Sequence, residues 1–312
     1  MKIGIVLNPV AGAGKAAQLW PQFEAEIRRQ LGDFTLMKTG RPEDAAYFSE
    51  QLAKQGYDLI IASGGDGTIG ETVDGMLKSG VPANALPRFS ILPCGTGSDF
   101  ARSLGMAGTP QQMTARIAAG KERQVDAGRV TFVDDEGKAA IRHFINIASL
   151  GLSGPTSRAV NRAKRSGKAS GQMLFIWHTI RELISYRFQD VRITVDGAPP
   201  IEARIAVVAA ANGRYFGGGM MIAPGAELDD GLLDLVIFRG AAKLTLIKDM
   251  RLLYTGSHVN HPSVTILRGR RITVEPLGDP ALNTAQLDID GESPGAIPAT
   301  FETLPKAIRV IC

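Results

Sequence analysis

Apolar runs alternate with amphipathic segments along the first 125 residues of the chain. The runs KIGIVL, FTLMKT, YDLIIA and FSILP are typical of buried strands, because polar or turn residues bound each of them. The segments between them show helical periodicity; in the first, Leu19, Phe23 and Ile27 share one face and Gly32 ends the helix. Repeated strand–helix units predict a parallel sheet with helices on both faces and a ligand edge at the carboxyl ends of its strands.

The pattern changes at about residue 126. Short β-branched runs separated by turn residues follow, and they predict a mainly antiparallel sandwich or barrel. These runs are GRVTFV, RHFINIAS, VRITVDG, ARIAVVAAANG, LLDLVIFRG, SVTILRG, RITVEPL and QLDIDGE. Two helices are expected within this part, around 158–188 and 242–255. We therefore predict an α/β protein with domains at 1–125 and 126–312, in which the last run, KAIRVIC, is a strand that either domain could hold.

Composition supports this picture and narrows the location of the protein. A chain of 312 residues is long enough for about two domains. Its two cysteines, Cys94 and Cys312, are too few for a zinc cluster or a disulfide framework, which favours a reducing cytoplasm. The first apolar residues are interrupted too early for a signal peptide, and no run approaches the roughly 18 apolar residues of a membrane span. The net charge of +4 tolerates anionic partners, but no basic segment carries the interleaved aromatic residues that nucleic-acid recognition requires.

Three glycine-rich loops follow predicted strands. They are NPVAGAGK (8–15), SGGDGT (63–68) and PCGTGSD (93–99). Glycine lets backbone amides approach an anion closely, while Thr68 adds a hydroxyl and the following helix adds its N-terminal dipole. A tight structural turn explains any one of these loops equally well. Three such loops at the same edge of the sheet favour a phosphate-binding site.

Two common nucleotide signatures match these loops poorly. A Walker A loop needs Ser or Thr after Gly14-Lys15, where this chain has Ala16, and it needs glycine where Pro9 stands. The dinucleotide fingerprint is matched locally from Gly12 to Ala17, but no acid ends the second strand. We therefore disfavour both a P-loop enzyme and a dehydrogenase.

Five motifs in this order give the chain a specific likeness. They are NPVAG, GGDGT, GTGSDFAR, YFGGGMMIAPGAELDDGLLDL and DIDGE. With them the sequence resembles the diacylglycerol and sphingosine kinase family, in particular its soluble bacterial lipid kinases. The resemblance implies a nucleotide-binding domain like those of 6-phosphofructokinases and NAD kinases, a β-sandwich domain that closes over the lipid headgroup, and transfer of the γ-phosphate of ATP to a lipid hydroxyl with Mg²⁺.

The resemblance also assigns roles to individual residues. The ATP-contacting positions it implies are Asn8, Pro9, Val10, Ala11, Gly12, Thr39, Gly65, Asp66, Gly67, Thr68, Ile69, Gly70, Glu71 and Thr96. It places a metal on the carboxylate of Asp230 and the carbonyls of Glu227 and Leu232, and it makes Glu292 the catalytic base. Gly70 and Ser98 depart from the family pattern, where many relatives have asparagine; Ser98 is still a suitable N-cap.

Without the family resemblance, the roles of Asp66, Glu292 and Asp230 have other interpretations. Asp66 would repel phosphate directly, so we hypothesise a catalytic role through Mg²⁺ or its waters, with Asp99 and Lys15 completing a charge network. The Asp-Gly before Glu292 is a common hairpin signal, and without the family a solvated turn is the simpler interpretation. Paired acids at Asp230 likewise often mark a polar turn.

Membrane contact is suggested by a basic segment beside an apolar helix. The cations are Arg158, Arg162, Lys164, Arg165 and Lys168, and the apolar side of the next helix carries Leu174, Trp177, Ile180 and Leu183. Such a pair can dock at the inner membrane surface, although a solvated face and a core-facing helix explain it as well. The histidines lack metal-ligand spacing, and His258 and His261 are expected in loops.

The expected activity is therefore that of a lipid kinase acting on diacylglycerol, phosphatidylglycerol or a similar lipid. An NAD kinase-like enzyme shares GGDGT, but GTGSDFAR and DGE disfavour it. A nucleotide or lipid sensor without turnover is a third interpretation, disfavoured by the presence of Asp230 and Glu292. A homodimer is left open.

Overall fold

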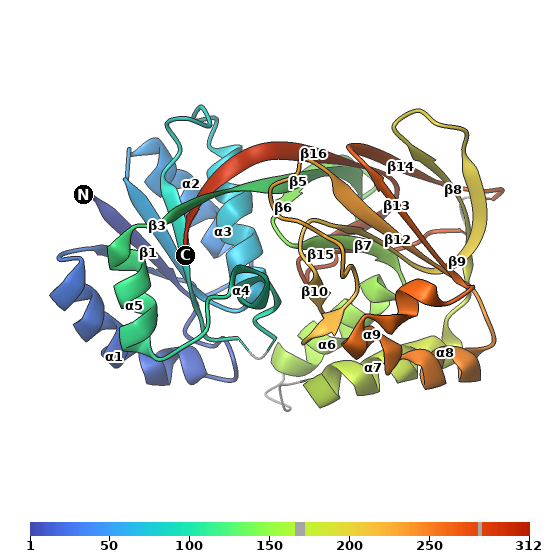
Figure 1. Cartoon of the computed structure of the whole chain (residues 1–312), viewed down its shortest axis with the longest axis horizontal. Helices are drawn as coiled ribbons and strands as arrows, with labels where there is room; N and C mark the ends of the chain where they lie inside the picture. The colour runs from blue at the N-terminus through green and yellow to red at the C-terminus, as the bar shows by residue number, and fades with distance from the viewer. Residues whose placement is uncertain (96, 166–171, 280–282) are drawn as a thin grey trace. The chain divides into compact units, whose positions relative to one another are not determined.

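The computed structural model describes residues 1–95, 97–165, 172–279 and 283–312 (Figure 1). The chain divides into two compact units, which are described separately below. Unit 1 comprises residues 1–126 and 306–312, and unit 2 comprises residues 127–305. Two strands, β5 (Glu122–Asp134) and β16 (Gly295–Ile311), contribute residues to both units.

Unit 1 alternates strands and helices as the hydrophobic pattern predicts. Its elements are β1 (Ile3–Leu7), α1 (Lys15–Gln30), β2 (Thr35–Lys38), α2 (Asp44–Lys54), β3 (Leu59–Gly64), α3 (Asp66–Lys78), β4 (Arg88–Pro93), α4 (Asp99–Leu104) and α5 (Pro110–Ala119). The strands pair in parallel in the order β2-β1-β3-β4, and Val310 of β16 pairs in parallel with Phe89 of β4. The predicted parallel sheet is confirmed.

The core of unit 1 lies between this sheet and its helices. Every residue of β1 and β3 is buried, as expected for strands covered on both faces. Helices α2 and α3 pack so closely that a Cβ on Gly75 would lie 2.0 Å from the carbonyl oxygen of Ala46. Helix α5 was not predicted; Thr109 and Gln112 form a capping box at its start.

Unit 2 is mainly antiparallel. With β5 and β16 its elements are β6 (Ala139–Phe144), β7 (Ile147–Gly151), α6 (Ser153–Arg165), α7 (Gln172–Ser185), β8 (Gln189–Val195), β9 (Ile201–Ala211), β10 (Tyr215–Phe216), β11 (Met220–Met221), β12 (Leu233–Arg239), α8 (Lys243–Asp249), α9 (Leu252–Thr255), η1 (Ser257–Asn260), β13 (Val264–Gly269), β14 (Arg271–Pro276) and β15 (Leu287–Ile289). Strands pair in the order β13-β12-β9-β8-β14-β16, and β9 also pairs with β7, so the predicted antiparallel sandwich is confirmed.

Three segments of unit 2 differ from the predicted elements. The run 142–149, predicted as one strand, is divided between β6 and β7 because the backbone turns at Ile145 and Asn146. The predicted helix at 158–188 corresponds to α6 and α7, with 166–171 outside the described residues. The helix at 242–255 is broken into α8 and α9. Periodicity located these helices but did not show where they end.

Candidate functional site

Three loops meet at the carboxyl edge of the sheet in unit 1. They follow β1, β3 and β4, as the sequence predicts. The amides of Cys94 and Gly95 both donate to the carbonyl of Gly64, at 2.8 and 3.2 Å, and the amide of Asn8 donates to Ser63 at 2.9 Å. The second loop is therefore bonded to the first and to the third.

Glycine is required at this edge because the backbones approach one another closely. Gly12 has a φ of 62°, and a Cβ there would lie 2.2 Å from the carbonyl oxygen of Cys94. A Cβ on Gly95 would lie 2.6 Å from the Cα of Gly65. The glycines keep the loops in contact and leave Gly64 and Gly65, just before α3, without side chains, which is the geometry that lets amides reach an anion.

Asn8 joins the first loop to α3. Its amide Nδ2 donates to the hydroxyl of Thr68 at 3.0 Å, and its Oδ1 accepts from the amide of Val10 at 3.2 Å. Thr68 is only 5% exposed. The motif residues Asn8 and Thr68 thus orient the two loops with respect to each other.

Asp66 links the second loop to the third. Its Oδ1 accepts from the amide of Phe100 in the first turn of α4 at 3.1 Å. The sequence predicted Ser98 as the cap of this helix, but Ser98 instead donates to the carbonyl of Gly95 at 3.0 Å and adopts a φ of 49°. The cap of α4 is therefore supplied by a carboxylate that is distant in sequence.

The remaining predicted nucleotide and charge residues occupy the same unit. The amide of Thr39 donates to Leu7 at the end of β1, and Glu71 accepts from the amide of Glu43 at 3.2 Å. Asp99 is buried at the start of α4, whereas Lys15 is exposed at the start of α1. Thr96 lies outside the described residues.

Cys94, at the base of the third loop, does not have the properties of a nucleophile. It is buried, and this burial raises the pKa of its thiol. A thiol with a raised pKa stays protonated at neutral pH and is unreactive. This edge therefore offers amides for anion binding and no thiol nucleophile at Cys94.

Glu292 lies at the end of a two-residue hairpin in unit 2. Ile289 and Glu292 exchange both backbone hydrogen bonds, at 2.7 and 3.0 Å. The two residues between them, Asp290 and Gly291, have φ values of 48° and 93°, as a type I′ turn requires. The hairpin interpretation of the Asp-Gly pair is thus geometrically correct, and the turn fixes the backbone at Glu292, whose side chain is half-buried.

Two buried carboxylates support this hairpin, and the sequence did not predict them as such. Asp290 accepts from the amides of Ile145, Asn146 and Ile147 at 2.9, 3.2 and 2.9 Å, which explains the break between β6 and β7. Asp288 accepts from the Ser157 hydroxyl at 2.8 Å. Its other oxygen accepts from the Gly291 amide at 2.9 Å. The hairpin is thereby tied to α6 and to the 145–147 turn.

Asp288 makes the stability of unit 2 depend on pH. Burial raises the pKa of its carboxyl from 3.8 to about 7, against the lowering effect of its hydrogen bonds from Ser157 and Gly291. Because the folded state holds the Asp288 proton more tightly than the unfolded state does, this group stabilises the fold fully below about pH 4. The stabilisation falls by up to about 1.4 kcal/mol per pH unit as the pH rises to about 7. Asp288→Asn should remove this loss, so the variant should gain stability relative to the wild type between pH 5 and pH 8 in urea unfolding. Parallel pH profiles would contradict the assignment.

The predicted metal site at Asp230 contains an arginine. One carboxylate oxygen of Asp230 accepts from the Leu232 amide at 3.0 Å, and the other forms an ion pair with Arg268. Arg268 also lies 3.5 Å from Asp234. Burial raises the pKa of the Asp234 carboxyl, and Arg268 offsets only part of this rise. No group of three His, Cys, Asp or Glu side chains that could hold a metal is found in the described part of the chain. The predicted site uses one carboxylate and two backbone carbonyls, and Mg²⁺ would have to displace Arg268 to reach that carboxylate, so this metal site stays a prediction.

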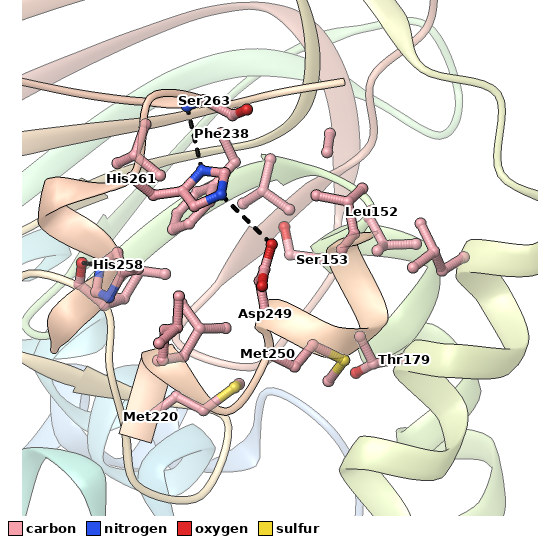
Figure 2. Close-up of a pocket in the computed structure, with 18 of the residues that line it drawn as sticks. Leu152, Ser153, Thr179, Met220, Phe238, Asp249, Met250, His258, His261 and Ser263 are labelled. Carbon is pink, nitrogen blue, oxygen red and sulfur yellow. Dashed lines mark hydrogen bonds and ion pairs between the residues drawn. The ribbon is translucent and has the colours of Figure 1, made fainter. Parts of the chain in front are cut away.

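Unit 2 also contains an apolar cavity that no sequence motif indicated (Figure 2). Its volume of about 120 Å³ is several times the roughly 10–15 Å³ that one water needs, so it can admit part of a ligand. Its wall includes residues of helices α6, α7, α8, α9 and η1 and of strands β9, β10, β11, β12 and β13. Representative lining residues are Leu152, Phe175, Leu183, Met220, Phe238 and Met250.

A few polar groups interrupt the apolar wall. Nε2 of His261 lies 3.4 Å from a carboxylate oxygen of Asp249, and the two side chains face each other in Figure 2. Nδ1 of His261 accepts from the Ser263 amide at 3.2 Å. His258, which was predicted in a loop, belongs to η1, is 2% exposed, bonds to the Ile222 carbonyl at 2.8 Å and stacks on Phe238. The spacing of residues along the sequence could not indicate this cavity, because its lining residues are spread from Leu152 to Val264.

The basic segment and its helix also differ from the prediction. Arg158 forms an ion pair with Asp135 at 2.5 Å, and Lys168 lies outside the described residues. Trp177 is 55% exposed whereas Leu183 is buried, so they do not share a core-facing side. Among the described residues, no helix combines the length and the apolar character needed to cross a membrane.

Comparison with known proteins accounts for both units. The diacylglycerol kinase catalytic domain family matches residues 2–130, and the YegS C-terminal NAD kinase beta sandwich-like domain family matches residues 146–312, more than half of the chain. A diacylglycerol kinase of Mycobacterium tuberculosis is 26% identical over 99% of this chain and 94% of its own length. One of Bacillus subtilis is 29% identical over 98% and 95%.

Solved structures show the same fold. A crystal structure of a diacylglycerol kinase from Bacillus anthracis aligns with a TM-score of 0.71 at 23% identity, covering 99% of this chain and 96% of that one. Yeast NADH kinase in complex with NADH aligns with a TM-score of 0.52 at 12% identity, covering 99% and 82%. With both family matches in chain order, the chain belongs to the diacylglycerol and sphingosine kinase family, among its bacterial lipid kinases.

Proposed function

We propose that the protein transfers the γ-phosphate of ATP, bound together with Mg²⁺, to a hydroxyl of a lipid such as diacylglycerol or phosphatidylglycerol. The apolar cavity of unit 2 is the observation that carries this proposal. Such a cavity suits an acyl chain, whereas a soluble dinucleotide acceptor would need polar groups along its length. The names of the relatives agree with this acceptor class.

Unit 1 supplies the nucleotide site in this proposal. The amides at Gly65 and at the start of α3 would bind the phosphates of ATP, while Asn8 and Thr68 keep the loops in register. Phosphoryl transfer depends mainly on positioning and charge neutralisation, so a rigid set of amides is appropriate. Asp66 would face the Mg²⁺ that accompanies the triphosphate, either directly or through water.

Glu292 supplies the proton acceptor in this proposal. Its hairpin is held by Asp288 and Asp290, so the backbone that carries this carboxylate is anchored in unit 2. As the lipid oxygen attacks the γ-phosphorus, the bond from phosphorus to the leaving ADP oxygen breaks, and the hydroxyl proton passes to Glu292. The products are a lipid phosphate and ADP.

Filling the cavity should separate lipid binding from nucleotide binding. Thr179 lines the cavity from α7, and Thr179→Phe would occupy space that the acyl chain needs. We expect KM for a long-chain diacylglycerol in mixed micelles to rise about tenfold or more, with KM for ATP unchanged. KM for a short-chain, water-soluble diacylglycerol should change less.

Thr179→Val is the matched control, because it keeps the shape of the side chain and removes only a hydroxyl that donates to the Phe175 carbonyl. Kinetics close to those of the wild type are expected for this variant. An equal rise in KM for long-chain and short-chain acceptors in Thr179→Phe would count against acyl-chain binding in the cavity.

A further inference from the structure

Helix α6 borders the apolar cavity with one of its faces. Ser153 and Thr156 of this helix, and Leu152 just before it, belong to the cavity wall. Figure 2 shows Leu152 and Ser153 at that wall. Ser153 and Thr156 are buried within unit 2. An acyl chain in the cavity would therefore pack directly against α6 and add van der Waals contacts to this face of the helix.

A neighbouring face of α6 is bonded to the hairpin that carries Glu292. Nδ2 of Asn161 donates to the carbonyl of Gly291 at 2.8 Å. Nε of Arg158, three positions earlier in the helix, donates to the hydroxyl of Ser293 at 3.0 Å. Side chains three positions apart lie on the same side of a helix. The residues on both sides of Glu292 are therefore held by side chains of one helix.

The same helix is anchored to β15, the strand that leads into the hairpin. Its Ser157 hydroxyl donates to Asp288, and the other carboxylate oxygen of Asp288 accepts from the Gly291 amide. Close packing adds to these bonds. A Cβ on Gly154 would lie 2.6 Å from both the Cβ and the carbonyl oxygen of Gln286, the residue before β15. Because α6 is joined to the hairpin at several points, a movement of the helix changes the position of the hairpin as well.

We propose that α6 couples acyl-chain binding in the cavity to the position of Glu292, with Asn161 and Arg158 as positioning residues. Ser153 and Thr156 contact the acyl chain, and the hydrogen bonds from Asn161 and Arg158 hold the hairpin. Binding energy from a remote part of a substrate can orient a reacting group, which raises kcat as well as affinity. A long-chain acceptor is therefore turned over faster at saturation than a short-chain acceptor that does not fill the cavity. This inference rests on the proposed lipid kinase function.

Asn161→Ala tests this coupling by kinetics. Alanine removes the bond to the Gly291 carbonyl and favours a helix more than asparagine does, so α6 should persist. In the wild type, kcat for dioleoylglycerol in mixed micelles should exceed kcat for water-soluble dihexanoylglycerol. In the variant, kcat for dioleoylglycerol should fall about tenfold, close to the short-chain value, with little change in KM for either lipid or for ATP. Asn84→Ala, at an exposed position between α3 and β4 of unit 1, is the matched control and should keep wild-type kinetics.

Hydrogen exchange without ATP tests the coupling independently of turnover. Deuterium uptake is compared in micelles with and without dioleoylglycerol, in the cavity segment 246–253 and in the hairpin segment 286–293. The lipid should slow exchange in both segments of the wild type, and only in the cavity segment of Asn161→Ala.

Three results would overturn the proposal. They are an equal loss of kcat for both acceptors in Asn161→Ala, unchanged hairpin protection in this variant, and no hairpin protection in the wild type. If the wild type phosphorylates no lipid, the proposed function fails, whereas the exchange experiment still decides whether α6 couples the cavity to the hairpin.

Discussion

Glu292→Gln is expected to reduce lipid phosphorylation by about a hundredfold to ten-thousandfold, the range that a general base contributes. Glutamine preserves the size of the side chain, and the Ile289–Glu292 backbone bonds that hold the hairpin do not involve the carboxylate. The affinity for ATP should be unchanged, because the proposed nucleotide site is built from unit 1. Turnover is measured with labelled ATP, and binding by calorimetry with a non-hydrolysable analogue.

Glu136→Gln is the matched control for this experiment. Glu136 is an exposed acid of the same unit that pairs with Lys138 at 2.7 Å in the turn between β5 and β6. Its loss should leave turnover unchanged, because exposed pairs contribute little. Wild-type turnover in Glu292→Gln would refute the base assignment, and a lowered melting temperature would indicate a structural role instead.

Asp66→Asn is expected to lower turnover by about tenfold to a thousandfold and to weaken the affinity for MgATP. The asparagine Oδ1 can still accept from the Phe100 amide, so α4 keeps its cap while the negative charge is lost. The fold should therefore persist, and the defect should come from the missing charge beside Mg²⁺. The measurement is kcat and KM for ATP across a Mg²⁺ titration.

Asp66→Ala separates the two roles of this residue, because it removes the cap as well as the charge. It should lose stability by about 1 kcal/mol in addition to the loss of activity. If Asp66→Asn retains full activity while Asp66→Ala loses it, Asp66 acts only by holding α4 against the second loop, and the metal-facing role is wrong.

The fold was predictable where local pattern decides it. The strand–helix alternation of unit 1 follows from apolar runs and glycine stops, and the antiparallel character of unit 2 follows from its short β-branched runs. Helix α5 could also have been predicted, since Thr109 and Gln112 spell a capping box. The break at Ile145 could not, because it depends on Asp290, which is 145 residues away.

The candidate site was predictable only in part, because several of its contacts join residues that are distant in sequence. Glycine loops after strands indicated an anion site, and the contact between Gly12 and Cys94 shows why those glycines occur. No residue near Asp230 in the sequence indicated that Arg268 would pair with it. Ser98 is a residue type that commonly caps helices, but the carboxylate of Asp66 accepts the hydrogen bond from the Phe100 amide in α4. The cavity collects side chains from several elements, so only the tertiary structure could assemble it.

The most direct test of the account is transfer of labelled γ-phosphate from ATP with Mg²⁺ to a panel of acceptors. Diacylglycerol, phosphatidylglycerol and a sphingoid base are offered in mixed micelles beside soluble NAD, with the wild type and Glu292→Gln in parallel. The account predicts label in a lipid and its loss in the variant. Label in NAD, or no label in any acceptor from a protein that binds ATP, would contradict it.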